Sequence, residues 1–147
     1  MIVVAHNFAS QARLEDIARN AFAYNIDLLV ISKASGMAMQ SGIPVVNRLA
    51  FEKGKNVLIT KDLKEAIELT KPEKIILIYD LAKEELDLNK EKIDKNTMLV
   101  FFGNYPVKNE LNLGKAYYIS PRGLAEPSQL VVIMEKIKNK KKKGKRC

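Results

Sequence analysis

The chain has 147 residues, which suits one ordinary domain with a single buried core. It has no run of about 18 apolar residues, and its start, MIVVAHNF, lacks the basic segment and long apolar run of a signal peptide. We therefore expect a soluble, cytoplasmic protein. The one cysteine, Cys147, has no partner for a disulfide or a zinc site, so both readings are excluded.

The net charge of +8 is concentrated at the end of the chain. The segment KNKKKKGKRC at 138–147 holds seven basic residues and no acid, which leaves 18 basic and 17 acidic residues in 1–137. Like charges with no apolar residues among them favour disorder, so we expect a domain at 1–137 and a disordered tail. The tail is either an auxiliary contact for the phosphates of RNA or only a solubilising segment. Its basic residues are Lys138, Lys140, Lys141, Lys142, Lys143, Lys145 and Arg146.

Apolar runs of strand length recur along the chain. They are IVVA at 2–5, DLLVIS at 27–32, NVLIT at 56–60, KIILIY at 74–79, MLVFFG at 98–103 and AYYI at 116–119. Most of these runs do not alternate with polar residues, which is typical of strands that are covered on both faces of a parallel sheet.

Helical patterns lie between these runs. Apolar residues at helical spacing from Leu14 to Phe22 predict an amphipathic helix over 11–24. A second helix is predicted within 36–53, opened by Pro44 and closed by Gly54, and a third starts near Asp62 and ends before Pro72. A last helix carries an apolar stripe over 130–137.

The alternation of strands and helices predicts a single α/β domain, with a mainly parallel sheet of about six strands flanked by helices. In this class, ligands bind beyond the carboxyl ends of the strands. The loops after Tyr79, Gly103 and Ile119 are therefore the candidate site loops.

The chain lacks the sequence motifs of several common kinds of active site. No G-x-G and no GxxxxGK[ST] occurs, which argues against ordinary dinucleotide and P-loop sites. Restriction-type nucleases need an acid pair and a lysine, commonly with E-x-K on a strand. No E-x-K is present, and the D-x-K at Asp62-Leu63-Lys64 falls at a helix start. We expect no metal site and no metal-dependent nuclease. His6 is expected to be a partly exposed loop residue, or else to line a pocket.

Three segments, taken in order, carry a resemblance. LEDIARNAFAYNIDLLVIS at 14–32 combines a helix that contains Arg19 with the second strand. LVFFGNYP at 99–106 is a hydrophobic strand that ends in glycine, and YYISPRGLAEPSQLVVIMEKI at 117–137 runs from a strand through a Pro- and Gly-containing loop into an apolar helix. Together they resemble the SPOUT superfamily of S-adenosylmethionine-dependent methyltransferases, which implies an α/β fold with a C-terminal trefoil knot.

The resemblance implies S-adenosylmethionine as cofactor and a homodimer. The implied cofactor-binding residues are Phe102, Gly103, Asn104, Tyr118, Ile119, Pro121, Gly123 and Leu124. Arg19 is the implied catalytic residue, in the role of positioning the acceptor; the alternative is a surface arginine paired with Glu15. Pro121 and Gly123 could instead only form a turn. Asp80 and Glu126 could accept a proton or could simply be solvated.

The function implied by the resemblance is S-adenosylmethionine-dependent methylation of RNA, either rRNA or tRNA. A protein acceptor stays open. The alternative is a non-catalytic RNA-binding or interaction protein on the same knotted scaffold.

Overall fold

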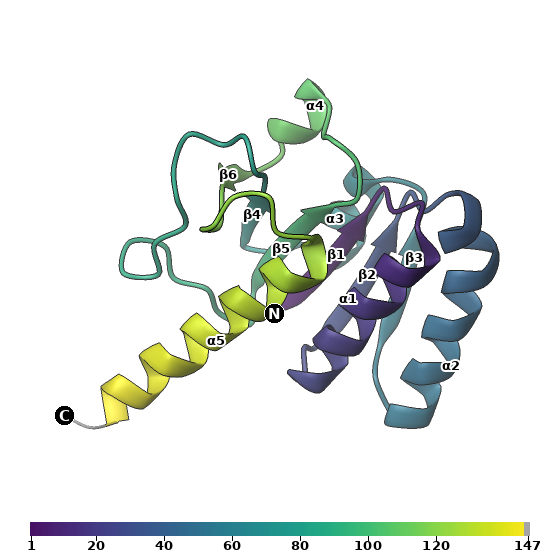
Figure 1. The fold of residues 1–147 in the computed structure, drawn as a ribbon, viewed down its shortest axis with the longest axis horizontal. Helices are drawn as coiled ribbons and strands as arrows, with labels where there is room; N and C mark the ends of the chain where they lie inside the picture. Colours follow the sequence, from purple (N-terminus) through teal and green to yellow (C-terminus); the bar gives the residue numbers. More distant parts are fainter. Residues whose placement is uncertain (146–147) are drawn as a thin grey trace.

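Six parallel strands form one sheet in the computed structural model, which describes residues 1–145 (Figure 1). The strands are β1 (Ile2–His6), β2 (Leu28–Ser32), β3 (Val57–Thr60), β4 (Lys74–Ile78), β5 (Thr97–Phe102) and β6 (Lys115–Tyr117). Their order is β3-β2-β1-β5-β4-β6, and all five pairings are parallel. The predicted α/β class with about six parallel strands is confirmed.

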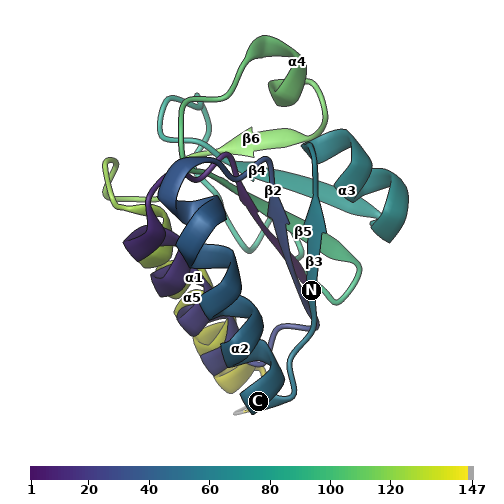
Figure 2. The same ribbon diagram turned by 90° about the vertical axis from the view of Figure 1, so that its right-hand side faces the viewer.

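Helices cover both faces of the sheet. Helices α1 (Gln11–Ala23), α2 (Ile43–Lys53) and α5 (Glu126–Lys145) lie on one face, and α3 (Leu63–Thr70) lies on the other (Figure 2). A π-helical turn, η1 (Ala38–Gly42), precedes α2, and the short α4 (Lys108–Leu111) follows β5. None of the described helices is both long and apolar enough to cross a bilayer.

The helix ends follow local chemistry. The Ser10 hydroxyl accepts a hydrogen bond from the Arg13 amide at the start of α1, and the Asp62 carboxylate accepts one from the Glu65 amide at the start of α3. Asp62 is therefore a helix cap, as its place in the sequence suggested. Gly54 ends α2 in the left-handed conformation, at φ 65°.

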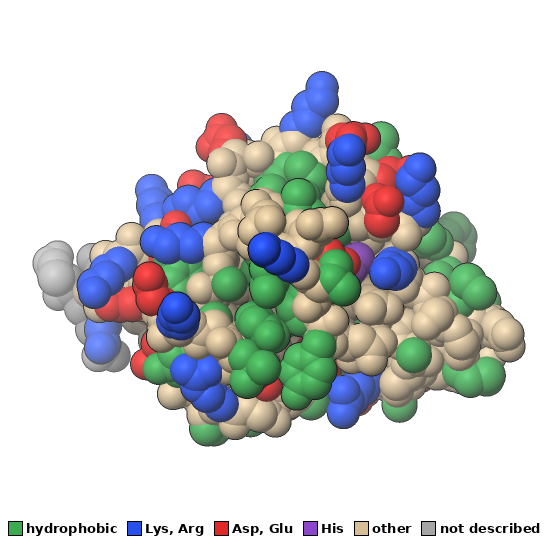
Figure 3. Space-filling view, turned by 90° about the horizontal axis from the view of Figure 1, so that it is seen from above, with side chains coloured by type: hydrophobic (Ala, Val, Ile, Leu, Met, Phe, Trp, Pro, Cys, Tyr) green, Lys and Arg blue, Asp and Glu red, His purple; other side chains and the backbone are tan. Residues whose placement is uncertain are grey.

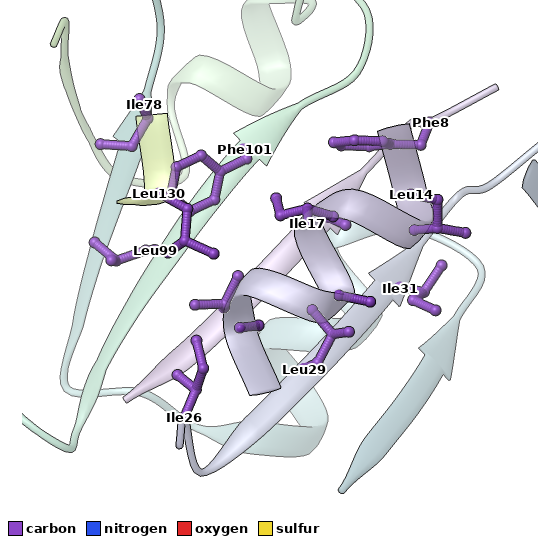
Figure 4. Close-up of a cluster of buried hydrophobic side chains, with 14 of the residues drawn as sticks. Phe8, Leu14, Ile17, Ile26, Leu29, Ile31, Ile78, Leu99, Phe101 and Leu130 are labelled. Atoms are coloured by element: carbon purple, nitrogen blue, oxygen red, sulfur yellow. The ribbon is translucent and has the colours of Figure 1, made fainter. Parts of the chain in front are cut away.

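The larger core lies between the sheet and helices α1, α2 and α5. Figure 4 shows Leu14 and Ile17 of α1 facing the strands, with Leu99 and Phe101 of β5 nearby and Leu130 of α5 beside them. A second cluster packs α3 against the opposite face of the sheet. Because the strands are buried on both faces, their apolar runs do not alternate with polar residues.

The C-terminal segment differs from its prediction. Helix α5 continues to Lys145, so residues 138–145 are helical where we expected disorder. Lysine has good helix propensity, and a helix already begun at the buried Leu130 extends at little further cost. The Lys140 ammonium also donates to the Leu88 carbonyl. Arg146 and Cys147 lie outside the described residues.

Candidate functional site

A cleft of about 330 Å³ opens at the carboxyl ends of the strands. The loops after β4 and β5 and the start of α5 form its walls, and Arg13 of α1 reaches its edge. Figure 3 looks down on this end of the molecule and shows Lys and Arg side chains, with Asp and Glu among them, around a central area of hydrophobic and other side chains. The cleft lies where ligands usually bind in parallel α/β sheets.

The structure gathers five of the eight predicted cofactor-binding residues in this cleft. They are Phe102, Gly103, Asn104, Gly123 and Leu124. The other three do not line it, and cofactor binding by any of the eight residues stays a prediction.

Two of those three residues are engaged elsewhere, and the third is exposed. Ile119 is buried in the core, because it continues the apolar run of β6. The Tyr118 ring lies under the Arg122 guanidinium, 3.6 Å from its central carbon. Pro121 is exposed.

Arg19 is exposed on α1 and does not line the cleft; Arg13, nearer the start of the same helix, does. The alternative, an ion pair between Arg19 and Glu15, is not among the ion pairs of the described residues either. The Glu15 carboxylate instead accepts a hydrogen bond of 3.3 Å from the side-chain amide of Gln11. Arg13 was missed because the sequence gives its direction only through the helix register. The available signal was its position in the first turn after the Ser10 cap, close to the carboxyl end of β1.

Gly103 fixes one wall of the cleft by close backbone contact. A Cβ at this position would lie 2.6 Å from the Asn7 carbonyl oxygen and 2.7 Å from the Phe8 Cα, so only glycine fits without a shift. The Gly103 amide donates to the His6 carbonyl at 2.8 Å, and the Asn104 side chain donates to the Asn7 carbonyl at 3.0 Å. The loop after β5 is thus tied to the segment that follows β1.

Two carboxylates lie in the cleft. One is paired with a cation, and the other accepts a hydrogen bond from a neutral side-chain amide. Glu126 pairs with the Arg13 guanidinium, with 3.4 Å between Nη1 and Oε2. Asp80 accepts a hydrogen bond of 3.0 Å from the Gln129 side-chain amide, and its own carbonyl accepts one from Arg122. Burial raises the pKa of Glu126 and the nearby charge of Asp80 raises it further, while the Glu126 backbone amide and Arg13 act in the opposite direction.

These two carboxylates are not a closed metal cage. Among the described residues, no cluster of three or more His, Cys, Asp or Glu side chains could hold a metal ion. Magnesium, however, is commonly held by one or two carboxylates together with water and substrate phosphate. Asp80 lines the cleft and is the carboxylate that suits such an open site.

His6 is fully buried at the end of the central strand β1, so the expectation of a partly exposed residue was wrong, and it does not line the cleft. Its Nδ1 lies 3.0 Å from the Ser32 hydroxyl, and its Nε2 contacts the Glu110 carboxylate. Burial lowers the pKa of His6 although Glu110 opposes this, so the neutral ring donates from Nε2 and accepts at Nδ1. His6 therefore fastens α4 to the sheet.

Comparison with known proteins decides the family. The family model described as "RecB-family nuclease (DUF2122)" matches residues 36–136. The chain belongs to this family. It is 33% identical over 144 residues to the "Putative type II restriction enzyme MjaORF1200P" of Methanocaldococcus jannaschii, covering 95% of this chain and 97% of that protein. It is also 33% identical over 108 residues to the "Putative type II restriction enzyme ApeKORF2002P" of Aeropyrum pernix, covering 72% and 69%.

Solved structures that share the fold are named as methyltransferases or RNA-modifying enzymes. The SpoU methyltransferase AviRb of Streptomyces viridochromogenes superposes with a TM-score of 0.71 at 12% identity, covering 91% of this chain and 56% of that one. The TrmH/SpoU tRNA modifying enzyme of A. aeolicus gives 0.67 at 14% identity, covering 97% and 76%. These likenesses support the SPOUT resemblance for the fold alone.

The predicted function is corrected by the family. An S-adenosylmethionine-dependent RNA methyltransferase, or a non-catalytic protein on its scaffold, does not agree with a nuclease family and two relatives named as restriction enzymes. Setting nucleases aside because E-x-K is absent was also wrong at the level of the family. Resemblance between folds misled the prediction, because one fold hosts many activities. Binding of S-adenosylmethionine, the knot and the homodimer stay predictions.

Proposed function

We propose that this chain is a nuclease that hydrolyses phosphodiester bonds of nucleic acid at the cleft beyond β4 and β5. The observation that carries the proposal is the group of Glu126, Asp80 and Arg13 in that cleft, in a chain of a nuclease family. The group offers the two kinds of side chain that the reaction needs: a base for the attacking water and a cation for the phosphate.

Arg13 is the phosphate-binding residue in this proposal. Its side chain is half-exposed and already faces a carboxylate in the cleft, so a phosphate oxygen can take over part of that pairing. A guanidinium stays charged at all relevant pH values and can bind two phosphate oxygens at once. Arg13 thereby positions the phosphorus atom within reach of Glu126.

Glu126 is the general base. A carboxylate with a raised pKa has a greater proton affinity at neutral pH than an ordinary glutamate. Water attacks phosphorus as the bond to the leaving ester oxygen breaks. Glu126 takes the proton of the water, and the leaving oxygen takes a proton from solvent. Gln129 holds Asp80 in place beside this base.

A divalent cation would be held by Asp80 together with water and the phosphate, and when bound it would supply positive charge for the phosphate oxygens.

The test uses the full chain with labelled single-stranded and duplex DNA and RNA, in Mg²⁺ and in a chelator. We expect cleavage by the wild type and a loss of roughly 10²- to 10⁴-fold in rate for Glu126→Gln, the usual contribution of a general base. Arg13→Ala is expected to weaken substrate binding and to slow cleavage.

Matched controls come from the same residue types elsewhere. Glu68→Gln and Arg48→Ala replace exposed side chains of α3 and α2 that do not line the cleft, and both variants should cleave at the wild-type rate. The proposal fails if the wild type cleaves none of the four substrates, or if Glu126→Gln cleaves as fast as Glu68→Gln.

A further inference from the structure

One aromatic side chain stands exposed at the rim of the cleft. Tyr105 lines the cleft and leaves 75% of its surface open. Other tyrosines of the chain are committed to partners. The Tyr24 hydroxyl donates to Glu135 at 2.6 Å, the Tyr117 hydroxyl donates to Glu91 at 2.6 Å, and the Tyr118 ring is covered by Arg122. Burial in the core does not account for an aromatic ring at position 105.

The loop that carries Tyr105 is anchored on both sides. Before it, the backbone of Gly103 is packed against the segment after β1, and the Asn104 side chain donates to the Asn7 carbonyl. After it, the Val107 amide donates to the Glu110 carboxylate at 3.0 Å. Only Tyr105 and Pro106 lie between these anchors, so the backbone on either side holds the ring at the rim.

The surroundings of the ring suit a nucleobase. Tyr79, which follows the neighbouring strand β4, lines the same cleft and adds a second aromatic surface. Asn104, Asp80 and Gln129 bring amide and carboxylate groups to the cleft, and such groups can pair with the edge of a base. With about 330 Å³, the cleft has room for one nucleotide-sized group.

We propose that Tyr105 is a stacking platform for an unpaired base, so that the nucleic acid at the cleft is single-stranded. This inference rests on the proposed function and adds the class of substrate. A base inside a duplex is covered on both faces by its neighbours, and only an unstacked base can place its face on a tyrosine ring. Stacking on an aromatic side chain also tolerates any base, so Tyr105 sets strand state and not sequence.

The absence of tryptophan from the chain makes a direct test possible. Tyr105→Trp keeps an aromatic surface and introduces a single fluorescent reporter at the rim. The control is Phe51→Trp, which places the same reporter on the outer end of α2, where the native side chain is 88% exposed. Both variants are titrated with a single-stranded DNA oligonucleotide in a chelator, which prevents cleavage that depends on a divalent cation.

We expect saturable quenching of the tryptophan in Tyr105→Trp and unchanged fluorescence in Phe51→Trp. In a binding assay, Tyr105→Ala should lose roughly 5- to 150-fold in affinity for the single strand, whereas Phe51→Ala should bind as the wild type does. The same oligonucleotide in duplex form should bind more weakly and should not distinguish Tyr105→Ala from the wild type.

Two outcomes overturn the inference and leave the proposed function intact. One is a single strand that is bound and cleaved equally well by wild type and Tyr105→Ala. The other is a preference for duplex with no quenching in Tyr105→Trp. A wild-type chain that binds no oligonucleotide at all would overturn both proposals together, so the two failures are distinguishable.

Discussion

Replacing Gly103 by alanine should destabilise the protein through a single added methyl group. The Cβ would stand 2.6 Å from the Asn7 carbonyl oxygen and 2.7 Å from the Phe8 Cα, where ordinary contacts begin near 3.4 Å. The Asn7 oxygen would have to retreat by about 0.8 Å and the Phe8 Cα by about 0.7 Å, the differences between these distances and 3.4 Å. Both atoms belong to the backbone, so no side-chain rotation can relieve the contact.

The expected loss is about 1–3 kcal/mol, the usual range for overpacking a well-packed site. For a chain of this size, each kcal/mol corresponds to a fall of about 2–4 °C in Tm. Urea unfolding followed by circular dichroism should show a lower midpoint with an unchanged dependence of the free energy on urea, because the same surface is exposed on unfolding.

Gly42→Ala is the matched control. Gly42 has an ordinary helical backbone conformation, and the atom nearest to its added methyl group is the tip of the Leu14 side chain, at 3.1 Å. A side-chain tip can move, and alanine favours the helix, so this variant should stay within about 1 kcal/mol of the wild type. If Gly103→Ala proves no less stable than Gly42→Ala, the account of the cleft wall is wrong.

Four further predictions concern the core, a buried histidine, the basic helix and the cofactor. Leu130→Ala, in a fully buried site, should cost about 2–5 kcal/mol in unfolding free energy, whereas the exposed Leu69→Ala should stay within about 0.5 kcal/mol; equal losses would contradict the assigned core. Because the pKa of His6 is lowered in the folded protein, the contribution of His6 to stability is complete above the unfolded-state pKa of 6.5 and is lost as pH falls through the folded-state pKa. Urea titrations between about pH 7 and 5 should therefore show a steeper fall in unfolding free energy for wild type than for His6→Gln. A chain that ends at Ile137 should bind nucleic acid more weakly and with a smaller dependence on salt, and an unchanged slope would leave the removed lysines as solubilising residues. S-adenosylmethionine should give saturable heat in calorimetry that bound oligonucleotide abolishes, since both would occupy one cleft; absence of heat removes the cofactor prediction.

The sequence predicted the sheet well because burial on both faces leaves a strong local signal. Each of the six apolar runs became a strand, and Pro44 and Gly54 lie at the beginning and end of α2, as predicted. The length of α5 was not predicted, because the choice between a solvated lysine run and a helix depends on whether the preceding turns are held by the core. The four-residue α4 is too short to show a period.

The sequence predicted where the candidate site lies in the fold better than it predicted which residues line it. Knowing that ligands bind beyond the strand ends was enough to find the loops of Gly103 and Gly123. Arg13 could not be chosen over Arg19 without the register of α1 against the sheet, and the pairing of His6 with Glu110 joins residues 104 apart in the chain. The activity was misjudged for a different reason: the strongest pattern in the sequence reports the fold, and the fold is shared by proteins of several functions.

The sheet order has a consequence for synthesis on the ribosome. Strand β1 is central, with β2 on one edge and β5 on the other. Its first partner follows within 32 residues, but its second partner is complete only at Phe102. For most of translation, a largely apolar strand therefore presents an open hydrogen-bonding edge, the kind of surface that invites pairing with another chain. Sequences of this family should be under pressure to delay the folding of β1 and β2, or to shield that edge, until β5 emerges.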